Sequence, residues 1–395
     1  MGDKKGNCYT IKLFNGFVLV SKQEIKMTIA ILYREELKEY DFGPGHPFRG
    51  DRYEVFPRFL REKLEPQGHY EFLSASGATD ADLSLICQRE YIEFTGNYYK
   101  PTNLGLDYDH RFHQFHTDDN RPVGQPGKLE EAARLIVGQA KKACDLIGAG
   151  RFKKVVSLGG GLHHAKPSRG EGFCLYNDVA FAGKYLLEKC GLQRILILDT
   201  DAHAGNGTAE YFYDDSRVLF IDLHQDPQTI YPGTGFIHQI GENEGKGYTI
   251  NLPMPVHAGD HCYRLVLEEV VLPVTFEFQP QIILRNGGSD PHFTDPLTNL
   301  GLSLNGFRMI GETVREMAQI CEGKAIDFIG SGYNKEILPY AWLALIAGLD
   351  NFQIQIEEPL PIPERLEEGS PYEETKTMIQ EIKKTLKEYW PCLAK

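Results

Sequence analysis

The stretch RILILDTDAH, residues 194–203, places a run of apolar residues directly before two aspartates and a histidine. Two other stretches have the same form, VVSLGGGLHH at residues 155–164 and QIILRNGGSD at residues 281–290. Each predicts a short buried strand that ends in a polar loop. Because ligands bind beyond the carboxyl ends of the strands in open α/β sheets, we expect these three loops to meet at one rim.

The rest of the chain continues this alternation of strand and helix patterns. Strands are expected at Thr28–Tyr33, Val155–Leu158, Arg194–Asp199, Val218–Leu223, Tyr248–Leu252 and Gln281–Asn286. Helices are expected at Lys128–Leu146, Asp178–Lys189, Tyr263–Phe276 and Glu373–Tyr389. Strands that alternate with helices indicate an α/β fold, in which a central, mainly parallel sheet is covered by helices on both faces.

The chain of 395 residues contains no internal repeat and no long Pro/Ser linker, so one domain over residues 27–395 is the economical interpretation. Residues 1–26 precede the first strand pattern and are expected to be an N-terminal extension, or to follow a start codon placed too early. Their apolar run is too short for a membrane span and has no small-residue cleavage site. Residues 357–371, rich in Glu and Pro, are expected to run over the surface.

The composition excludes several classes of protein. A hydrophobic fraction of 42% and a charged fraction of 25% are those of an ordinary globular protein. A net charge of −13 argues against nucleic acid as a direct partner, since duplex binding needs clustered Lys and Arg. The eight cysteines form no Cys-x-x-Cys pair, which excludes a zinc ribbon. With no secretion signal and no membrane span, we expect reduced thiols and a cytoplasmic location.

Three residues at the predicted rim could bind a metal ion. Asp201 and His203 are separated by one residue at a strand end, so both side chains can point to the same side. Asp290, which follows another strand, supplies a third ligand. Three protein ligands with an open position describe a catalytic zinc site. An Asp-x-His pair alone is a weak motif, and it gains weight here from the other polar residues at the neighbouring strand ends.

The same rim carries groups suited to proton transfer. His163 and His164 follow three glycines, and a histidine can serve as base for a metal-bound water and as acid for a leaving amine. Asp199 and Asn206 flank the metal ligands and are placed to accept hydrogen bonds from the two imidazoles. Tyr333, in a glycine-rich loop, could stabilise an oxyanion.

Several motifs together resemble one known family. They are GHP at residues 45–47, HHAKPS at 163–168, GFCLYND at 172–178, DTDAHAGNG at 199–207, YPGTG at 231–235 and DPLT at 295–298. In this order they resemble the zinc-dependent histone deacetylase superfamily, which includes acetoin-utilisation proteins and acetylpolyamine amidohydrolases. The resemblance covers residues 27–348. It implies a three-layer αβα, arginase-like fold with a narrow tunnel leading to the metal.

The resemblance also implies roles for the rim residues. Asp201, His203 and Asp290 match the zinc ligands, and the same set also accepts iron(II). His163 and His164 match the paired active-site histidines, with His164 as the proton shuttle. Tyr333, Asp199 and Asn206 complete the catalytic set. The implied reaction is hydrolysis of an acetyl-lysine (acyl-lysine) amide of a protein or peptide, in which metal-activated water attacks the carbonyl and releases acetate and a free amine.

Other residues resemble the family's substrate-binding positions. Gly172, Phe173 and Tyr231 match the tunnel walls, although the family usually has Phe at the last of these. Asp119 resembles the rim aspartate that binds the substrate backbone, with Asp118 as a rival because the segment contains an inserted residue.

Leu297 bears on the choice of substrate. It stands where polyamine-selective relatives carry a carboxylate, which favours an acyl-lysine over a small acetylated amine such as an acetylpolyamine. An arginase-type enzyme with two manganese ions would need further bridging carboxylates. A non-catalytic acyl-lysine binding module is disfavoured because every catalytic position is filled. The sequence leaves the acyl chain and the oligomeric state open.

Two departures from the family pattern concern charge. The backbone at Asp199, Asp201 and His203, with Asp222 and Leu223, resembles a buried monovalent-cation site suited to potassium; the family more often has Ser at the position of Asp222. Asn206 stands where many relatives have Asp. Because an amide stabilises an imidazolium less than a carboxylate does, the sequence predicts a lower pKa for the neighbouring histidine than Asp would give.

Overall fold

The computed structural model describes residues 7–14, 17–24, 29–100, 110–124, 127–363, 366 and 370–394; for residues 7–24 and 370 it describes the backbone alone. Thr28, the first residue of a predicted strand, lies outside the described residues. So do residues 364, 365 and 367–369 of the predicted surface segment.

Among the described residues, eight strands form one sheet in which every neighbouring pair is parallel. Their order is β4-β3-β5-β10-β9-β6-β7-β8. The strands are β3 (Ile29–Leu32), β4 (Tyr70–Leu73), β5 (Lys154–Leu158), β6 (Ile195–Asp199), β7 (Val218–Gln225), β8 (Thr249–Met254), β9 (Ile282–Gly287) and β10 (Ala325–Ile329). Six match predicted strands. Most of their side chains are buried, as expected for strands covered on both faces.

The sequence patterns did not predict β4 and β10. β4 is a half-buried edge strand, and β10 lies in the middle of the sheet between β5 and β9. The position of β10 matters for function, because the loop that contains Tyr333 follows it directly. Tyr333 therefore joins the same rim as the three loops predicted from the sequence.

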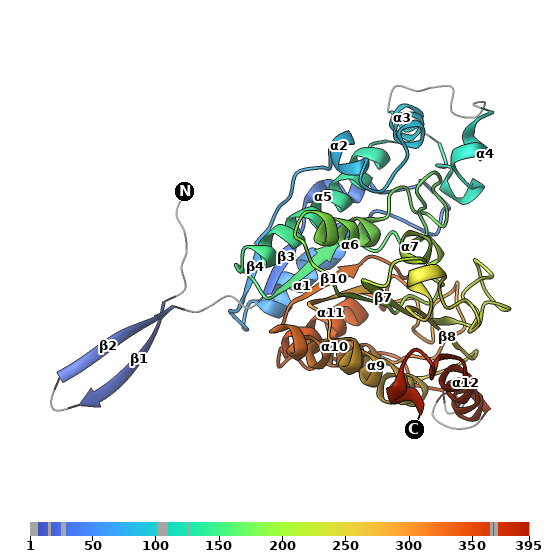
Figure 1. The fold of residues 1–395 in the computed structure, drawn as a ribbon. Coiled ribbons are helices and arrows are strands. Elements are labelled where there is room, and N and C mark those ends of the chain that lie inside the picture. Colours follow the sequence, from blue (N-terminus) through green and yellow to red (C-terminus); the bar gives the residue numbers. More distant parts are fainter. Residues whose placement is uncertain are drawn as a thin grey trace.

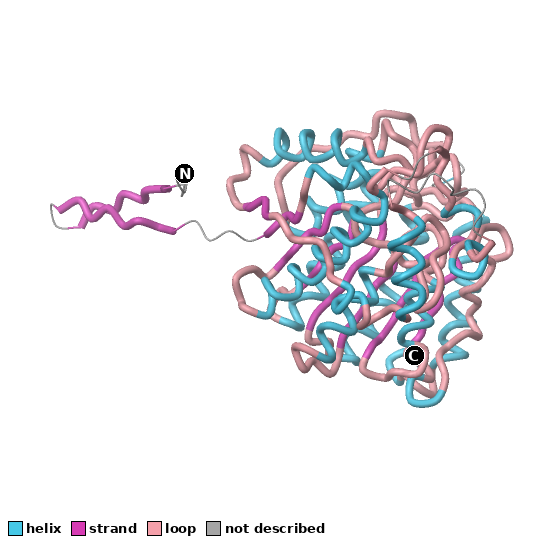
Figure 2. The backbone as a smooth tube through the Cα atoms, turned by 90° about the horizontal axis from the view of Figure 1, so that it is seen from above, coloured by secondary structure: helices cyan, strands magenta, loops and turns pink. Residues whose placement is uncertain are grey.

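Helices cover both faces of the sheet, which confirms the three-layer α/β fold (Figure 1). α5 and α6 pack together on one face, and α1, α10 and α11 lie on the other. Figure 2 shows the strands passing between these helical layers. The helices are α1 (Arg52–Leu64), α2 (Asp80–Leu83), α3 (Arg89–Tyr98), α4 (Phe112–Phe115), α5 (Leu129–Gly148), α6 (Asp178–Glu188), α7 (Asn206–Phe212), α8 (Asp260–Val266), α9 (Leu272–Phe278), α10 (Leu304–Met317), α11 (Leu338–Asp350) and α12 (Ser370–Leu386).

One predicted helix has a different form in the structure. The pattern at 263–276 predicted a continuous α-helix, but a π-helical segment, Leu267–Val271, separates α8 from α9. Pro273 lies at the start of α9, where the missing backbone N–H of a proline is tolerated. The π turn adds one residue to a helical turn, and α8, the π segment and α9 still follow one another without a break.

α11 is apolar on nearly all sides and is almost entirely buried, as expected for a helix inside a large domain. It packs against α10, and the indole of Trp342 donates a hydrogen bond to the carbonyl of Ser331 at 3.0 Å. The helix thus anchors the loop that carries Tyr333. Across the described ranges, no helix combines the length and the apolar character that a membrane crossing requires.

The N-terminal residues form a hairpin of their own. β1 (Asn7–Phe14) and β2 (Phe17–Glu24) pair antiparallel, with Asn7 opposite Glu24, in a two-stranded sheet separate from the central one. Figure 1 draws this hairpin away from the αβα body. The sequence suggested an extension here and gave it no secondary structure.

A buried ion pair joins two central strands below the rim. Arg285 on β9 lies opposite Asp327 on β10, and the distance from Nε of the arginine to Oδ1 of the aspartate is 2.5 Å. Their side chains are 1% and 3% exposed. Such a pair adds little to stability over an apolar pair, but removing one partner leaves an uncompensated charge in the core.

We therefore expect Asp327→Asn to lower the free energy of unfolding by about 3–5 kcal/mol, because Arg285 keeps its charge without a carboxylate partner. Urea denaturation followed by circular dichroism measures this change. The double substitution Arg285→Met with Asp327→Leu serves as the control and should lose much less. A loss below about 1 kcal/mol in Asp327→Asn would show that water or another group compensates the arginine.

Candidate metal centre and active site

Four neighbouring strands, β5, β10, β9 and β6, end at the same edge of the sheet and carry the predicted site residues on their loops. His163 and His164 follow β5, and Tyr333 follows β10. Asp290 follows β9, and Asp201 follows β6. The structure therefore brings together, at the carboxyl edge, residues that are up to 170 positions apart in the chain.

Asp201, His203 and Asp290 form a compact cluster in which one ligand atom of each lies within 4.8 Å of the other two. Nδ1 of His203 lies 3.1 Å from Oδ1 of Asp201 and 3.2 Å from Oδ2 of Asp290. The two carboxylates are buried, and the imidazole is 12% exposed. Two adjacent buried carboxylates need positive charge nearby, and one nitrogen with two oxygens is a donor set suited to a divalent cation.

The electrostatics of this cluster agree with a cation site. Burial and the neighbouring Asp201 carboxylate raise the pKa of Asp290 to about 7. Burial opposes the charge on His203, but hydrogen bonds to the two carboxylates outweigh it and raise the pKa of that imidazole to about 10. Without a metal the cluster thus retains protons, which a metal would have to displace.

Other side chains hold the ligands in place. The hydroxyl of Ser331 donates to Oδ1 of Asp290 at 2.7 Å, and the hydroxyl of Thr298 donates to the Asp290 carbonyl at 2.5 Å. The backbone N–H of His203 donates to Oδ1 of Asp201 at 2.8 Å. These contacts hold the two carboxylates and the backbone of Asp290 in place before any ligand binds.

The two histidines lie side by side, as the sequence anticipated. Nδ1 of His163 is 2.8 Å from Oδ2 of Asp199, and Nδ1 of His164 is 2.7 Å from Oδ1 of Asn206. Their Nε2 atoms are 3.1 Å apart.

Burial opposes the charge on His163, but Asp199 and Asp201 outweigh it and raise its pKa to about 9. Burial, followed by the charges of His163 and His203, lowers the pKa of His164 well below its usual value. The pair therefore contains one charged and one neutral imidazole.

Three polar residues that the sequence analysis gave no role support these groups. Asn286 donates to both carboxylate oxygens of Asp199 at 2.9 Å. Asp178 accepts from the backbone N–H of Leu162 at 2.8 Å and so fixes the loop before His163. Asp295 accepts from the N–H of Tyr333 at 2.8 Å. Asp178 and Asp295 lie within the family motifs, and this position could have identified them from the sequence. For Asn286 the sequence offered only its position at the end of a predicted strand.

A narrow cavity of about 30 Å³ leads to the metal cluster. The rings of Phe173 and Tyr333 both line it and meet edge-to-face, with centroids 6.0 Å apart and an interplanar angle of 71°. Phe173 has a positive φ of 65°, and the Tyr40 hydroxyl holds its carbonyl at 2.6 Å. A Cβ on Gly172 would lie 2.3 Å from Cδ2 of His164, so only glycine fits there. The lining residues are Phe48, Gly159, Gly160, Gly161, Leu162, His163, His164, Gly172, Phe173, Cys174, Asp201, His203, Gly330, Ser331 and Tyr333.

The other predicted substrate-binding residues, the tunnel-wall candidate Tyr231 together with Asp119 and Leu297, are not among the residues that line this cavity. Tyr231 is 43% exposed, and its ring packs edge-on against His164 with centroids 5.1 Å apart. Oδ2 of Asp119 accepts from the N–H of Gly172 at 2.9 Å, which ties this carboxylate to the tunnel wall. Its rival Asp118 is exposed and pairs with Arg121. Leu297 is 38% exposed.

The predicted monovalent-cation residues lie on two adjacent strands, β6 and β7, and on the loop that follows β6. Asp199 on β6 and Asp222 on β7 are direct neighbours, and Leu223 follows on β7. Nδ1 of His224 lies 3.1 Å from Oδ1 of Asp222, and its Nε2 lies 2.9 Å from the Gly235 carbonyl. With an acceptor at each ring nitrogen, His224 is suited to a double donor, and Asp222 raises its pKa against the opposing effect of burial.

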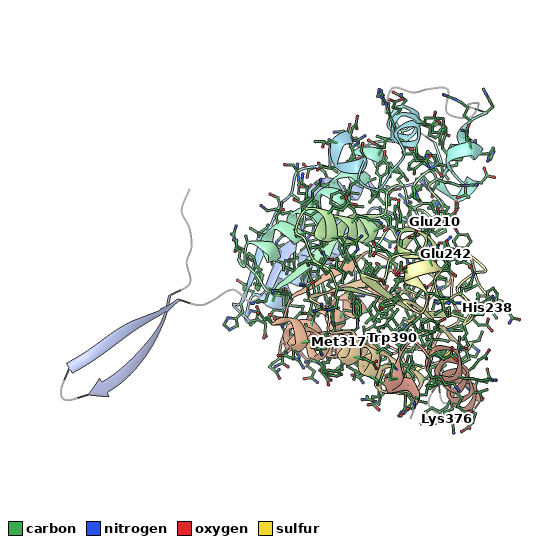
Figure 3. All side chains as sticks on the ribbon, in the orientation of Figure 1. Glu210, His238, Glu242, Met317, Lys376 and Trp390 are labelled. Atoms are coloured by element: carbon green, nitrogen blue, oxygen red, sulfur yellow. The ribbon has the colours of Figure 1, made fainter. Side chains whose placement is uncertain are left out.

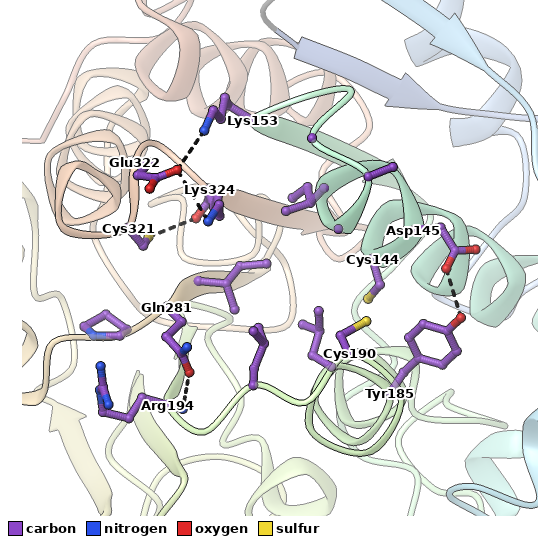
Figure 4. A pocket seen from close by; sticks show the side chains of 18 of the residues that line it. Cys144, Asp145, Lys153, Tyr185, Cys190, Arg194, Gln281, Cys321, Glu322 and Lys324 are labelled. Atoms are coloured by element: carbon purple, nitrogen blue, oxygen red, sulfur yellow. Dashed lines mark hydrogen bonds and ion pairs between the residues drawn. The ribbon is translucent and has the colours of Figure 1, made fainter.

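A larger cavity, of about 890 Å³, lies at the opposite end of the sheet (Figure 4). Residues at the amino ends of β5, β6, β9 and β10 line it, and it contains none of the predicted site residues. Several of its polar groups pair with one another: Lys153 pairs with Glu322 at 3.1 Å, and Tyr185 donates to Asp145 at 2.9 Å. The chemistry of the small cavity, and not its size, therefore identifies the candidate active site.

The parallel sheet and the metal-type cluster at its carboxyl edge define the molecule as an α/β protein with the features of a metal-dependent hydrolase. A model of the histone deacetylase domain matches residues 46–349. The chain belongs to the histone deacetylase family, and it is accordingly a deacetylase, a hydrolase that acts on amide bonds.

Individual relatives agree with this assignment. A protein of Archaeoglobus fulgidus described as a probable deacetylase is 35% identical over 377 residues, covering 93% of this chain and 99% of its own. The acetoin utilization protein AcuC of Staphylococcus xylosus is 34% identical over 328 residues, covering 82% and 83%. The crystal structure of the HDA15 HD domain superposes with a TM-score of 0.76 at 25% identity, covering 93% of this chain and 97% of that one. The expected arginase-like fold is thereby confirmed.

Proposed function

We propose that this deacetylase is zinc-dependent and hydrolyses the side-chain amide of acetyl-lysine, or a related acyl-lysine, in a protein or peptide. One observation carries the proposal. Asp201 and His203 line the same narrow cavity as His164 and Tyr333, and Asp290 completes the metal cluster beside them. No packing requirement explains why three acidic or imidazole groups and a phenol converge there.

The cluster fits a divalent metal ion. The donor set of two carboxylates and one imidazole suits zinc, and it also accepts iron(II). When bound there, the metal would polarise the amide carbonyl and lower the pKa of a water molecule in the site to about 7.

The chain's own residues would move the protons. His164, which is neutral, can accept a proton at Nε2 from the attacking water and deliver it to the departing amine nitrogen. His163 is held by Asp199 and carries positive charge beside it. Burial raises the pKa of Tyr333 well above its usual value, so its hydroxyl stays protonated and can donate to the carbonyl oxygen as negative charge develops.

The tunnel suits an extended aliphatic chain. The aromatic rings of Phe48, Phe173 and Tyr333 line the narrow cavity, and Phe48 packs against Phe173 with centroids 6.4 Å apart. Asp119 lies at the outer side of the wall, within the proposed binding region for the substrate backbone. Leu297 offers no charge to a distal ammonium group, which favours acetyl-lysine over an acetylated polyamine.

Two further assignments belong to the same proposal. Residues 27–395 make up one deacetylase domain, with residues 1–26 as an N-terminal extension; the separate pairing of β1 with β2 supports this boundary. A potassium ion is proposed at the backbone of Asp199, Asp201, His203 and Leu223 together with Asp222. The side-by-side carboxylates of the two strands support it.

The experiment that tests the substrate compares an acetyl-lysine peptide with acetylputrescine, using zinc-loaded and iron-loaded protein. We expect kcat/KM to be at least about tenfold higher for the peptide, because the ammonium of acetylputrescine meets no carboxylate at Leu297. A preference for acetylputrescine would establish the small-amine alternative instead. Failure to cleave any acylated amine would contradict the proposal, and two manganese ions per chain would indicate an arginase-type enzyme.

A further inference from the structure

Glu171 is a buried carboxylate beside the active site that the reaction described above does not use. Its side chain is 10% exposed, and Oε1 accepts a hydrogen bond from Nδ2 of Asn206 at 2.5 Å. Nζ of Lys166 lies 3.2 Å from the same oxygen. Glu171 does not contact the metal cluster. It reaches the reaction centre through one intermediary, the amide of Asn206.

The amide of Asn206 joins two groups with opposite requirements. Its Oδ1 faces Nδ1 of His164 at 2.7 Å, while its Nδ2 faces Glu171. An amide has a donor end and an acceptor end, whereas an ionised carboxylate can only accept. Glu171 therefore accepts only the N–H₂ end of Asn206. The carbonyl end is then directed at His164, which must carry its proton on Nδ1.

We propose that Glu171 is a positioning residue that fixes the orientation of the Asn206 amide and, through it, the tautomer of His164. The inference rests on the proposed function, since it assigns His164 the transfer of protons at Nε2. With the proton on Nδ1, the single lone pair of Nε2 is left to accept a proton in the cavity, where Nε2 of His163 lies 3.1 Å away. If the amide were reversed, Nδ1 would become the acceptor and Nε2 would carry the proton, so His164 could not act as a base.

Lys166 makes the role of Glu171 more specific. The lysine can only donate, and it lies within 3.2 Å of the carboxylate and 3.8 Å of the exposed Glu210. If residue 171 were apolar, the lysine would attract the carbonyl end of Asn206 and favour the reversed amide. Figure 3 labels Glu210 and Glu242, two other carboxylates that line the same cavity of about 640 Å³, but only Glu171 contacts the amide in the described part of the chain.

The pairing also explains why Asn is found at position 206 in this chain. An aspartate there would put two carboxylates in direct contact at the place of the 2.5 Å hydrogen bond. Like charges at that separation cannot both stay ionised in a buried site. An amide at position 206 therefore requires an acceptor at position 171, and a carboxylate at position 206 would require a donor there. Changing one of the two side chains alone breaks the chain of hydrogen bonds from Glu171 through Asn206 to His164.

The test compares Glu171→Leu with Glu171→Gln, which keeps an acceptor oxygen, and with Glu210→Leu as the matched control from the same cavity. We expect Glu171→Leu to lower kcat roughly 10–100-fold with KM and metal content little changed, as for other residues that orient an active-site imidazole. Glu171→Gln and Glu210→Leu should stay within about threefold of the unmodified protein.

A second readout does not depend on activity. ¹⁵N NMR of the metal-free protein, with His164 assigned by comparison with a His164→Asn variant, should show Nδ1 protonated in the unmodified chain and a shift toward Nε2–H in Glu171→Leu. Unchanged tautomer and kcat in Glu171→Leu would overturn the proposal, and so would equal losses in Glu171→Leu and Glu171→Gln. If no substrate is cleaved at all, the proposed function fails while the NMR result still decides this inference.

An exchange of the two side-chain types provides an independent check. Asn206→Asp alone should lower kcat, because its carboxylate meets Glu171. Adding Glu171→Gln should recover most of that loss, because the glutamine N–H₂ group can donate to the new carboxylate, which still accepts from His164. A double variant no more active than Asn206→Asp would contradict the proposed hydrogen-bond chain from residue 171 through residue 206 to His164.

Discussion

Replacing Asp290 by asparagine is expected to abolish tight metal binding and to reduce kcat/KM by at least about 10³-fold. The reason is the loss of one of three charged or imidazole donors from a buried cluster. A Lewis acid supplies several kcal/mol of transition-state stabilisation, and about 1.4 kcal/mol corresponds to a factor of ten in rate. Metal content by mass spectrometry and steady-state kinetics with an acetylated peptide measure the two effects.

The fold should survive this change, because asparagine has the shape of aspartate and can still exchange a hydrogen bond with the hydroxyl of Ser331. Asp145→Asn, at the opposite end of the sheet, is the matched control and should retain full metal content. If Asp290→Asn bound zinc as tightly as the unmodified protein, Asp290 would not be a ligand.

The pH dependence of metal binding adds a second measure of the same site. Burial and Asp201 raise the pKa of Asp290 to about 7, so below that pH the site holds a further proton, besides the one on His203, that the metal must displace. Zinc affinity of the unmodified protein should therefore fall as the pH is lowered from about 8 to about 6. An affinity that stays constant over this range would contradict the assignment of a protonated carboxyl in the metal-free cluster.

The parts of the fold that could be predicted from the sequence are those with local patterns. Continuous apolar runs before Asp199 and Asn286 identified β6 and β9, because strands buried on both faces have no polar alternation. β10 was missed because its centre carries Asp327, and only the neighbouring strand supplies the Arg285 that makes burial of this charge tolerable. β4 was missed because it is short and only half-buried at the edge of the sheet.

The same distinction holds for the active site. The metal cluster could be predicted because each ligand follows a recognisable strand, and family motifs surround it. The contacts that support the histidine partners join distant segments: Asn286 donates to Asp199, and Asn206 donates to Glu171, which lies 35 positions away in the chain. No spacing rule predicts such contacts, since they depend on the three-dimensional positions of loops that follow different strands.

Substituting Tyr333 by phenylalanine is expected to lower kcat by about 10²–10³-fold while KM changes only a few-fold, because a donor aimed at the developing oxyanion acts mainly in the transition state. The phenol is well placed for this role. Its backbone N–H is held by Asp295 at 2.8 Å, its ring faces Phe173, and burial keeps its pKa far above neutrality. Steady-state kinetics with an acetylated peptide, together with metal analysis, make the measurement.

The control for this prediction is Tyr340→Phe, which removes the same hydroxyl from a tyrosine that is 36% exposed and packs on Phe59 away from the cavity. It should leave kcat unchanged. Tyr333→Phe keeps the ring against Phe173, so metal content and thermal stability should also be preserved. A variant that kept more than about a third of the original kcat would show that the phenol only packs against the tunnel wall, and stabilisation of the oxyanion would then have to come from other donors at the rim.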